Sequence, residues 1–151
     1  MNDFFAQILA NKPIWAGFWA LLLAQIVKPP LYRLTHPNWN WSLVISTGGM
    51  PSSHAALVVA TTVGIGLREG FSTSIFALAW VIAMIVIYDA TGVRRQAGDH
   101  ARILNLMIDE LFTGHPLAEK ELKERLGHTP REVVGGVLLG IVVAFVTVRF
   151  F

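Results

Sequence analysis

The segment TGGMPSSHAAL, residues 47–57, places small and polar residues directly before an apolar stretch. Pro51 suits the first position of a helix, where its missing N–H costs nothing. The next backbone N–H groups, those of Ser52, Ser53 and His54, would then point out of the helix start, which carries partial positive charge and favours a phosphate. The hydroxyls add donors, and His54 can give or take a proton. Alternatively, the serines only cap the helix and His54 bonds a neighbouring carbonyl.

The sequence GHTPREV, residues 127–133, predicts a second helix start of the same kind. Thr129 at the N-cap and Glu132 three residues later form the pattern of a capping box, with Pro130 at the first helical position. His128 lies just outside this helix. If it reaches the same face as His54, the two histidines form a pair for proton transfer or nucleophilic attack; the alternative is a structural histidine in a tight turn.

Charged residues near the end of another apolar run add to these features. Arg94 and Arg95 offer planar donor forks that match phosphate oxygens, although two such arginines can also snorkel to lipid headgroups. Asp89 ends the apolar run, where an unpaired carboxylate is costly, so we expect it to have a cationic or histidine partner.

The elements that must position these residues are membrane helices. The chain is 54% hydrophobic and only 15% charged, which favours an all-α integral membrane bundle with a single domain, residues 1–151. Four stretches approach the length of a membrane span: residues 13–27, extendable backwards through Phe4 and Phe5, and residues 51–67, 71–90 and 132–151. The second is short and polar at its start. Between the last two lies a charged segment, residues 94–127, predicted to form one or two interfacial or cytoplasmic helices.

The distribution of basic residues predicts the topology. With four spans, the loops 28–50 and 90–131 share one side and hold nine of the 12 Lys and Arg residues, which places both loops in the cytoplasm and both termini outside. The chain has no cysteine, which excludes disulfides and thiolate metal sites. A net charge of +2 gives no indication of a nucleic-acid partner. The first apolar run has neither a basic start nor a cleavage site, so we expect a retained membrane helix.

These motifs resemble those of the type-2 phosphatidic acid phosphatase and vanadium haloperoxidase superfamily. MPSSH looks like its P-S-G-H motif, and VRRQAGDH is similar to its S-R-x5-H-x3-D motif. Together with LAQIVKPP and LGHTPREVVGGVLLG, they look closely like the small divergent bacterial and plant branch. The resemblance implies a metal-independent reaction without a cofactor, in which His54 is the general acid, Arg94 a phosphate ligand and His100 the nucleophile that forms a phosphohistidine.

The chain departs from the superfamily pattern at three points. Lys28 and Arg33 are too close together for the first motif, K-x6-R-P. The orienting aspartate four residues after His100 is replaced by Leu104, so Asp89 or Asp99 would have to substitute. The GHTP setting of His128 matches the divergent branch, which leaves His100 and His128 as alternative nucleophiles. The chain also offers four helices where the larger enzymes pack about six, so a homodimer, through Gly136-x-x-x-Gly140, could complete the site.

The predicted function is that of a multi-pass cell-membrane phosphatase, with its active site on the cytoplasmic face, acting on a lipid phosphomonoester or pyrophosphate. The alternatives are a non-catalytic protein or small transporter that binds anionic lipids and, less favoured, a vanadate-type peroxidase. The expected catalytic residues are His54, His100, His128 and Asp89, and the expected phosphate ligands are Lys28, Gly49, Ser52, Ser53, Arg94 and Arg95.

Overall fold

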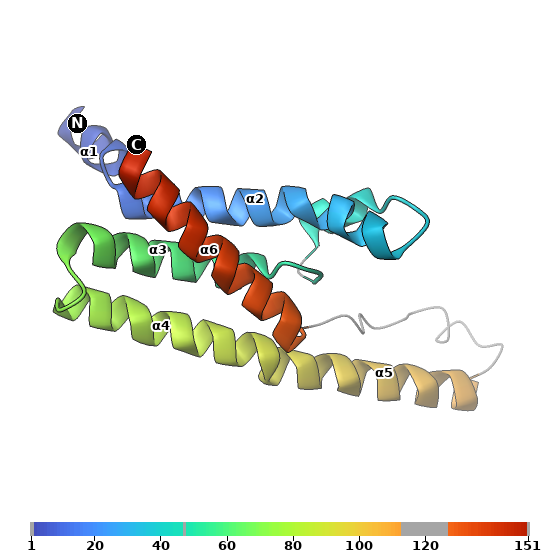
Figure 1. Cartoon of the computed structure of the whole chain (residues 1–151). Helices are drawn as coiled ribbons and strands as arrows, with labels where there is room; N and C mark the ends of the chain where they lie inside the picture. The colour runs from blue at the N-terminus through green and yellow to red at the C-terminus, as the bar shows by residue number, and fades with distance from the viewer. Residues whose placement is uncertain (1, 47, 113–126, 151) are drawn as a thin grey trace.

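The computed structural model of the chain describes residues 2–46, 48–112 and 127–150. Within these ranges the fold is all-helical, as predicted (Figure 1). The elements are α1 (Asn2–Leu9), α2 (Lys12–Thr35), a short 3-10 helix η1 (Trp41–Ile45), α3 (Ser53–Glu69), α4 (Ser74–Thr91), α5 (Val93–Phe112) and α6 (Pro130–Phe150).

Helices α2, α3, α4 and α6 form a bundle in which consecutive helices run in opposite directions (Figure 1). At one end of this bundle, here called the site end, α2 and α4 finish and α3 and α6 begin. Both chain termini lie at the other end. Three helical stretches of the described residues are long and apolar enough to cross a membrane: Lys12–Thr35, Ser74–Ile108 and Pro130–Phe150. The 17-residue α3 is shorter and packs against α2, α4 and α6.

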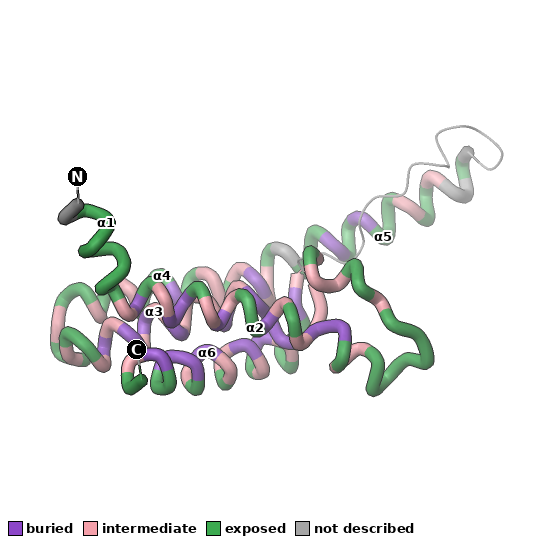
Figure 2. Tube along the Cα trace, turned by 90° about the horizontal axis from the view of Figure 1, so that it is seen from above, coloured by how far each residue is buried: buried purple, intermediate pink, exposed green. Residues whose placement is uncertain are grey.

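The bundle packs through small side chains. The buried cluster at its centre consists of alanines and one valine: Ala16, Ala20, Ala24, Ala56, Ala60, Val143 and Ala144. Small residues at four-residue spacing let helix backbones approach closely, as in membrane helix pairs. Figure 2 shows the buried positions concentrated on α2, α3 and α6, whereas α4 is mostly exposed. The large apolar side chains therefore face outward, where a membrane protein meets lipid.

Gly136 and Gly140 of α6 pack against another helix of the same chain. A Cβ atom on Gly136 would overlap the carbonyl oxygen of Ser52, and one on Gly140 would lie 2.7 Å from the carbonyl oxygen of Ala56. Helix α6 therefore packs directly on the backbone of α3. The Gly136 and Gly140 surface, which was a candidate for a homodimer contact, is therefore packed against α3 within the chain.

The first membrane helix differs from its prediction at both ends. It does not extend back into α1, because the side chain of Asn11 accepts a hydrogen bond from the Ile14 N–H and starts a new helix there. At the other end it continues through Pro29 and Pro30 to Thr35. The fixed φ of proline is compatible with a helix, so the continuation costs the hydrogen bonds that these two residues cannot donate.

The charged segment forms a helix over the part that the structure describes. The apolar residues Ile103, Leu104 and Met107 of α5 are exposed. The remainder of the predicted segment, residues 113–126, lies outside the described residues.

The contact between α6 and α3 gives a direct test of this packing. We expect Gly136→Ala to destabilise the protein by about 1–3 kcal/mol, because the added methyl group meets backbone atoms that cannot move aside. Gly135→Ala is the matched control: its Cβ atom would lie 3.1 Å from the Cε atom of Met50, a flexible side-chain end. Thermal unfolding in detergent should separate the two variants. Equal melting temperatures would contradict the close α3–α6 contact.

Candidate active site at the site end of the bundle

Helix α3 starts later than the sequence predicted. Ser52 is its N-cap, so the helix begins at Ser53 and Pro51 precedes the cap. The N–H of Ser52 donates to the carbonyl oxygen of Glu132 at 2.8 Å and is not available to a ligand. The capping alternative is therefore correct for Ser52. The other two amides expected at the helix start, those of Ser53 and His54, lie in the first turn of α3.

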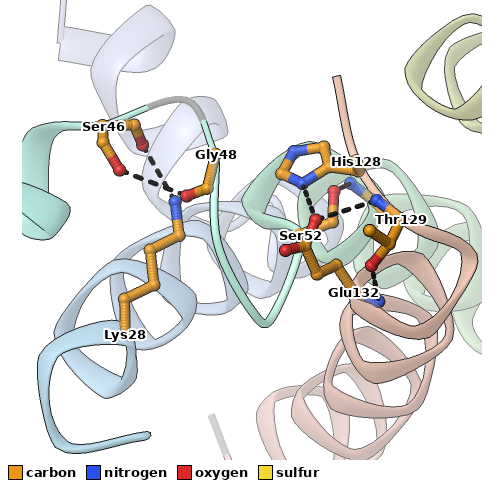
Figure 3. Close-up of polar contacts among 8 residues, drawn as sticks. Lys28, Ser46, Gly48, Ser52, His128, Thr129 and Glu132 are labelled. Carbon is orange, nitrogen blue, oxygen red and sulfur yellow. Dashed lines mark hydrogen bonds and ion pairs between the residues drawn. The ribbon is translucent and has the colours of Figure 1, made fainter. Parts of the chain in front are cut away.

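A buried lysine lies beside this helix start. Lys28 is 1% exposed, and its Nζ donates to the carbonyl oxygen of Ser46 at 2.9 Å (Figure 3). The chain then turns at Gly49, whose φ of 88° is a left-handed conformation that favours glycine. A Cβ atom at Gly49 would lie 3.9 Å from the Cδ atom of Lys28. The loop thus folds over the lysine. An ammonium group has three N–H donors, and the carbonyl oxygen of Ser46 accepts only one of them.

Two contacts hold His128 in place, one through its backbone N–H and one through its side chain. Its side chain is buried, and its backbone N–H donates to the carbonyl oxygen of Ala90 at 2.9 Å, which ties it to the end of α4. Its Nδ1 lies 3.2 Å from the Oε2 atom of Glu132 (Figure 3). Its Nε2 is buried and has no hydrogen-bond partner among the residues that the structure describes. A buried polar atom without a partner is costly, which indicates a place where a ligand atom belongs.

Glu132 has two roles at the start of α6. The capping box is confirmed: the Thr129 N–H donates to Oε2 of Glu132 at 2.9 Å, and the Glu132 N–H donates to Oγ1 of Thr129 at 3.4 Å. The same carboxylate contacts His128, so it also orients the imidazole ring. Glu132 and Lys28 lie close enough to attract each other electrostatically. These two groups provide a carboxylate and a cation on either side of the start of α3.

The orienting role of Glu132 was missed in the sequence, where this residue was assigned only to the cap. A signal for it exists. Glu132 follows His128 by four residues, the spacing at which the superfamily motif places its aspartate after the histidine. The sequence instead places the orienting carboxylate, Asp89 or Asp99, at His100, and this stays a prediction.

The structure brings His54 and His128 together. His54 is half-buried in the first turn of α3, and the two ring centroids are 6.4 Å apart with an interplanar angle of 59°. This separation is larger than a direct hydrogen bond between two ring nitrogens allows. A separation of this size allows both rings to contact one small group that lies between them.

The remaining predicted residues have different positions. His100, Asp99 and Arg95 are exposed on α5, a helix that continues beyond the site end (Figure 1). Asp89 is half-buried in the last turn of α4. The side chain of Arg94 lies outside the described residues. No group of three or more His, Asp or Glu residues in the described part of the chain is arranged to hold a metal ion.

Comparison with known proteins identifies the family of the chain. Residues 9–143 match the family described as "Divergent PAP2 family". The chain belongs to the Divergent PAP2 family. The uncharacterized membrane protein YuiD of Bacillus subtilis (strain 168) is 43% identical over 156 aligned positions, which cover 96% of this chain and 99% of that protein. No solved structure matches the chain. The superfamily resemblance and the membrane class are thereby confirmed.

The contact between His128 and Glu132 determines which ring nitrogen carries the proton. A carboxylate accepts hydrogen bonds, so we expect neutral His128 to carry its proton on Nδ1 and to leave the Nε2 lone pair open. The ¹⁵N chemical shifts of labelled histidine in detergent report the tautomer. In Glu132→Gln, we expect this preference to weaken. A wild-type His128 protonated on Nε2 alone would contradict the assignment.

Proposed function

We propose that this member of the Divergent PAP2 family is an integral-membrane phosphatase that hydrolyses a lipid phosphomonoester or pyrophosphate through a phosphohistidine at His128. The observation that carries the proposal is the buried His128 ring, with Nδ1 on the Glu132 carboxylate and Nε2 open. This arrangement, a nucleophile oriented by a hydrogen-bonded partner, is the usual form of an activated side chain in covalent catalysis.

The first step transfers the phosphoryl group to the protein. Nε2 of His128 attacks phosphorus, an N–P bond forms, and the bond from phosphorus to the lipid oxygen breaks. His54 donates a proton to the departing oxygen, so that the lipid leaves as an alcohol or, from a pyrophosphate, as a monophosphate. Glu132 stabilises the Nδ1–H side of the imidazole while positive charge develops on the ring.

The second step restores the protein. Water attacks the phosphohistidine, the N–P bond breaks, and inorganic phosphate leaves. His54 accepts the proton of the attacking water. The same residue thus acts first as acid and then as base, as microscopic reversibility requires for a covalent intermediate.

Charge on the transferring phosphoryl oxygens is stabilised by groups that are already in place. Lys28 supplies a buried cation, and the first turn of α3, with the N–H groups of Ser53 and His54, supplies a helix start. Preorganised donors of this kind provide the largest share of catalysis in phosphoryl transfer. Arg94, in the first turn of α5, is proposed as an additional ligand on the basis of the superfamily motif, and Arg95 beside it because of its planar donor fork.

The proposed site faces the cytoplasm, because the loops at the site end hold most of the basic residues. The residues that we place in the reaction, Lys28, His54, His128 and Glu132, come from one chain. A homodimer is therefore not required to assemble the proposed catalytic pair.

The choice of nucleophile can be tested with two histidine variants. We expect His128→Gln to lower phosphate release from phosphatidate and phosphatidylglycerophosphate by at least about 10³-fold, because the covalent route is lost. His100→Gln is the matched control and should retain most of the activity. Rapid quenching with ³²P-labelled substrate should trap acid-labile label on wild-type protein but not on His128→Gln. The reverse result would transfer the role to His100.

The role of Lys28 is testable in the same assay. We expect Lys28→Met to reduce kcat by about 10²–10³-fold, the usual loss when one preorganised donor to a transition state is removed. Arg33→Met, which removes an exposed cation on the same helix, should have little effect.

Binding of these lipids without phosphate release, and without a difference between the histidine variants, would instead support a non-catalytic protein that binds anionic lipids.

A further inference from the structure

A second cluster of cations lies at the opposite end of the bundle, away from the proposed active site. A surface hollow of about 600 Å³ is lined by Leu9, Ala10, Lys12, Trp15, Trp19 and Arg68. Its residues come from the end of α1, the first two turns of α2 and the last turn of α3. The hollow thus combines two positive charges with two indole rings.

The two cations are held in place by backbone carbonyl groups. Nη1 of Arg68 donates to the carbonyl oxygen of Ala10, and Nζ of Lys12 donates to the carbonyl oxygen of Val148 at 3.1 Å. These carbonyls lie at the ends of α1 and α6, where a helix carries partial negative charge. Arg68 also lies 3.7 Å from Glu69 in an exposed ion pair. A guanidinium has five donors and an ammonium has three, so both cations retain capacity for an anion.

The surroundings place this hollow at the level of lipid headgroups. Phe4, Phe5 and Leu9 of α1 are each more than 60% exposed, as in a short helix that lies on a membrane surface. Trp15 and Trp19 face the hollow at the beginning of a membrane-length helix, the position that tryptophan prefers in membrane proteins.

An adjoining hollow of about 420 Å³ shares Ala10 and Arg68 with the first one. Its lining is mixed: Pro13, Ile14, Ile65 and Ile75 lie there beside the polar residues Gln7, Asn11, Thr61 and Glu69. Cations with apolar side chains next to them match a phospholipid, which has a phosphate next to acyl chains. Free phosphate has no group that would use the apolar part.

We infer that the hollow formed by Lys12, Arg68, Trp15 and Trp19 binds the phosphate of an anionic phospholipid in the leaflet opposite the proposed active site. Lys12 and Arg68 bind the phosphate oxygens, the indoles pack on the glycerol region, and one acyl chain follows the adjoining hollow. This lipid is a bound structural ligand. The inference does not depend on the proposed phosphatase activity.

The test is native mass spectrometry of the full chain in neutral detergent, titrated with phosphatidylglycerol or phosphatidylcholine. Phosphatidylglycerol is a phosphodiester, so it is no substrate for the proposed reaction. We expect it to bind at least about tenfold more tightly than phosphatidylcholine, and Lys12→Gln or Arg68→Gln to weaken it about tenfold, the usual contribution of a charged hydrogen bond. Arg149→Gln removes an exposed cation at the same end that does not line the hollow, and Lys28→Gln removes the cation of the proposed active site. Both should bind as wild type does.

Several results would overturn the inference. Equal affinity for the two lipids, or an equal loss in Arg149→Gln, would show a general effect of charge. Displacement of phosphatidylglycerol by millimolar inorganic phosphate would assign the hollow to a free anion. A loss in Lys28→Gln alone would place the lipid at the other end of the bundle.

A second measurement leaves the hollow unchanged, in case the charge variants do not fold. A chain with Trp39→Phe, Trp41→Phe and Trp80→Phe keeps only Trp15 and Trp19 as fluorophores. We expect phosphatidylglycerol with brominated acyl chains to quench this fluorescence at lower concentration than brominated phosphatidylcholine. Quenching at the same concentration would contradict the site.

Discussion

One backbone hydrogen bond, from the Ser52 N–H to the Glu132 carbonyl, joins the first turns of α3 and α6 at 2.8 Å. The bond requires the two helix backbones to approach closely, and Gly136 permits this because it has no Cβ atom to meet Ser52. The same contact places His54, on α3, beside His128, which precedes α6. The rest of the site depends on this junction, because its two histidines are delivered by two different helices.

The site end also contains more buried polarity than packing alone would require. Lys28 is almost completely buried, and both Ser52 and His128 are buried nearby. Removing charged and polar groups from water costs free energy unless they are paired, and an open Nε2 on a buried imidazole leaves part of that cost uncompensated. Departures of this kind from good packing are expected at functional sites. The alanine core, by contrast, contributes close packing and no chemistry.

Local chemistry made the helix starts predictable. Thr129, Pro130 and Glu132 specify a capping box by themselves, and the structure confirms it. The start of α3 was predicted too early. Ser52 is the N-cap through a local bond, in which its Oγ accepts from the Ala55 N–H, whereas its own N–H bonds to Glu132, a residue far away in sequence. For the same reason, the sequence left two nucleophiles open. The burial of His128 and its contact with Glu132 favour it as the proposed nucleophile over His100, which is exposed on α5.

The most direct test of this account is a structure of the protein with orthovanadate, which imitates the five-coordinate phosphorus of the transition state. We expect vanadium bonded to Nε2 of His128, with Lys28 and the first turn of α3 on its oxygens and His54 on the opposite side. Vanadium bonded to His100, or vanadate bound away from the junction of α3 and α6, would contradict it.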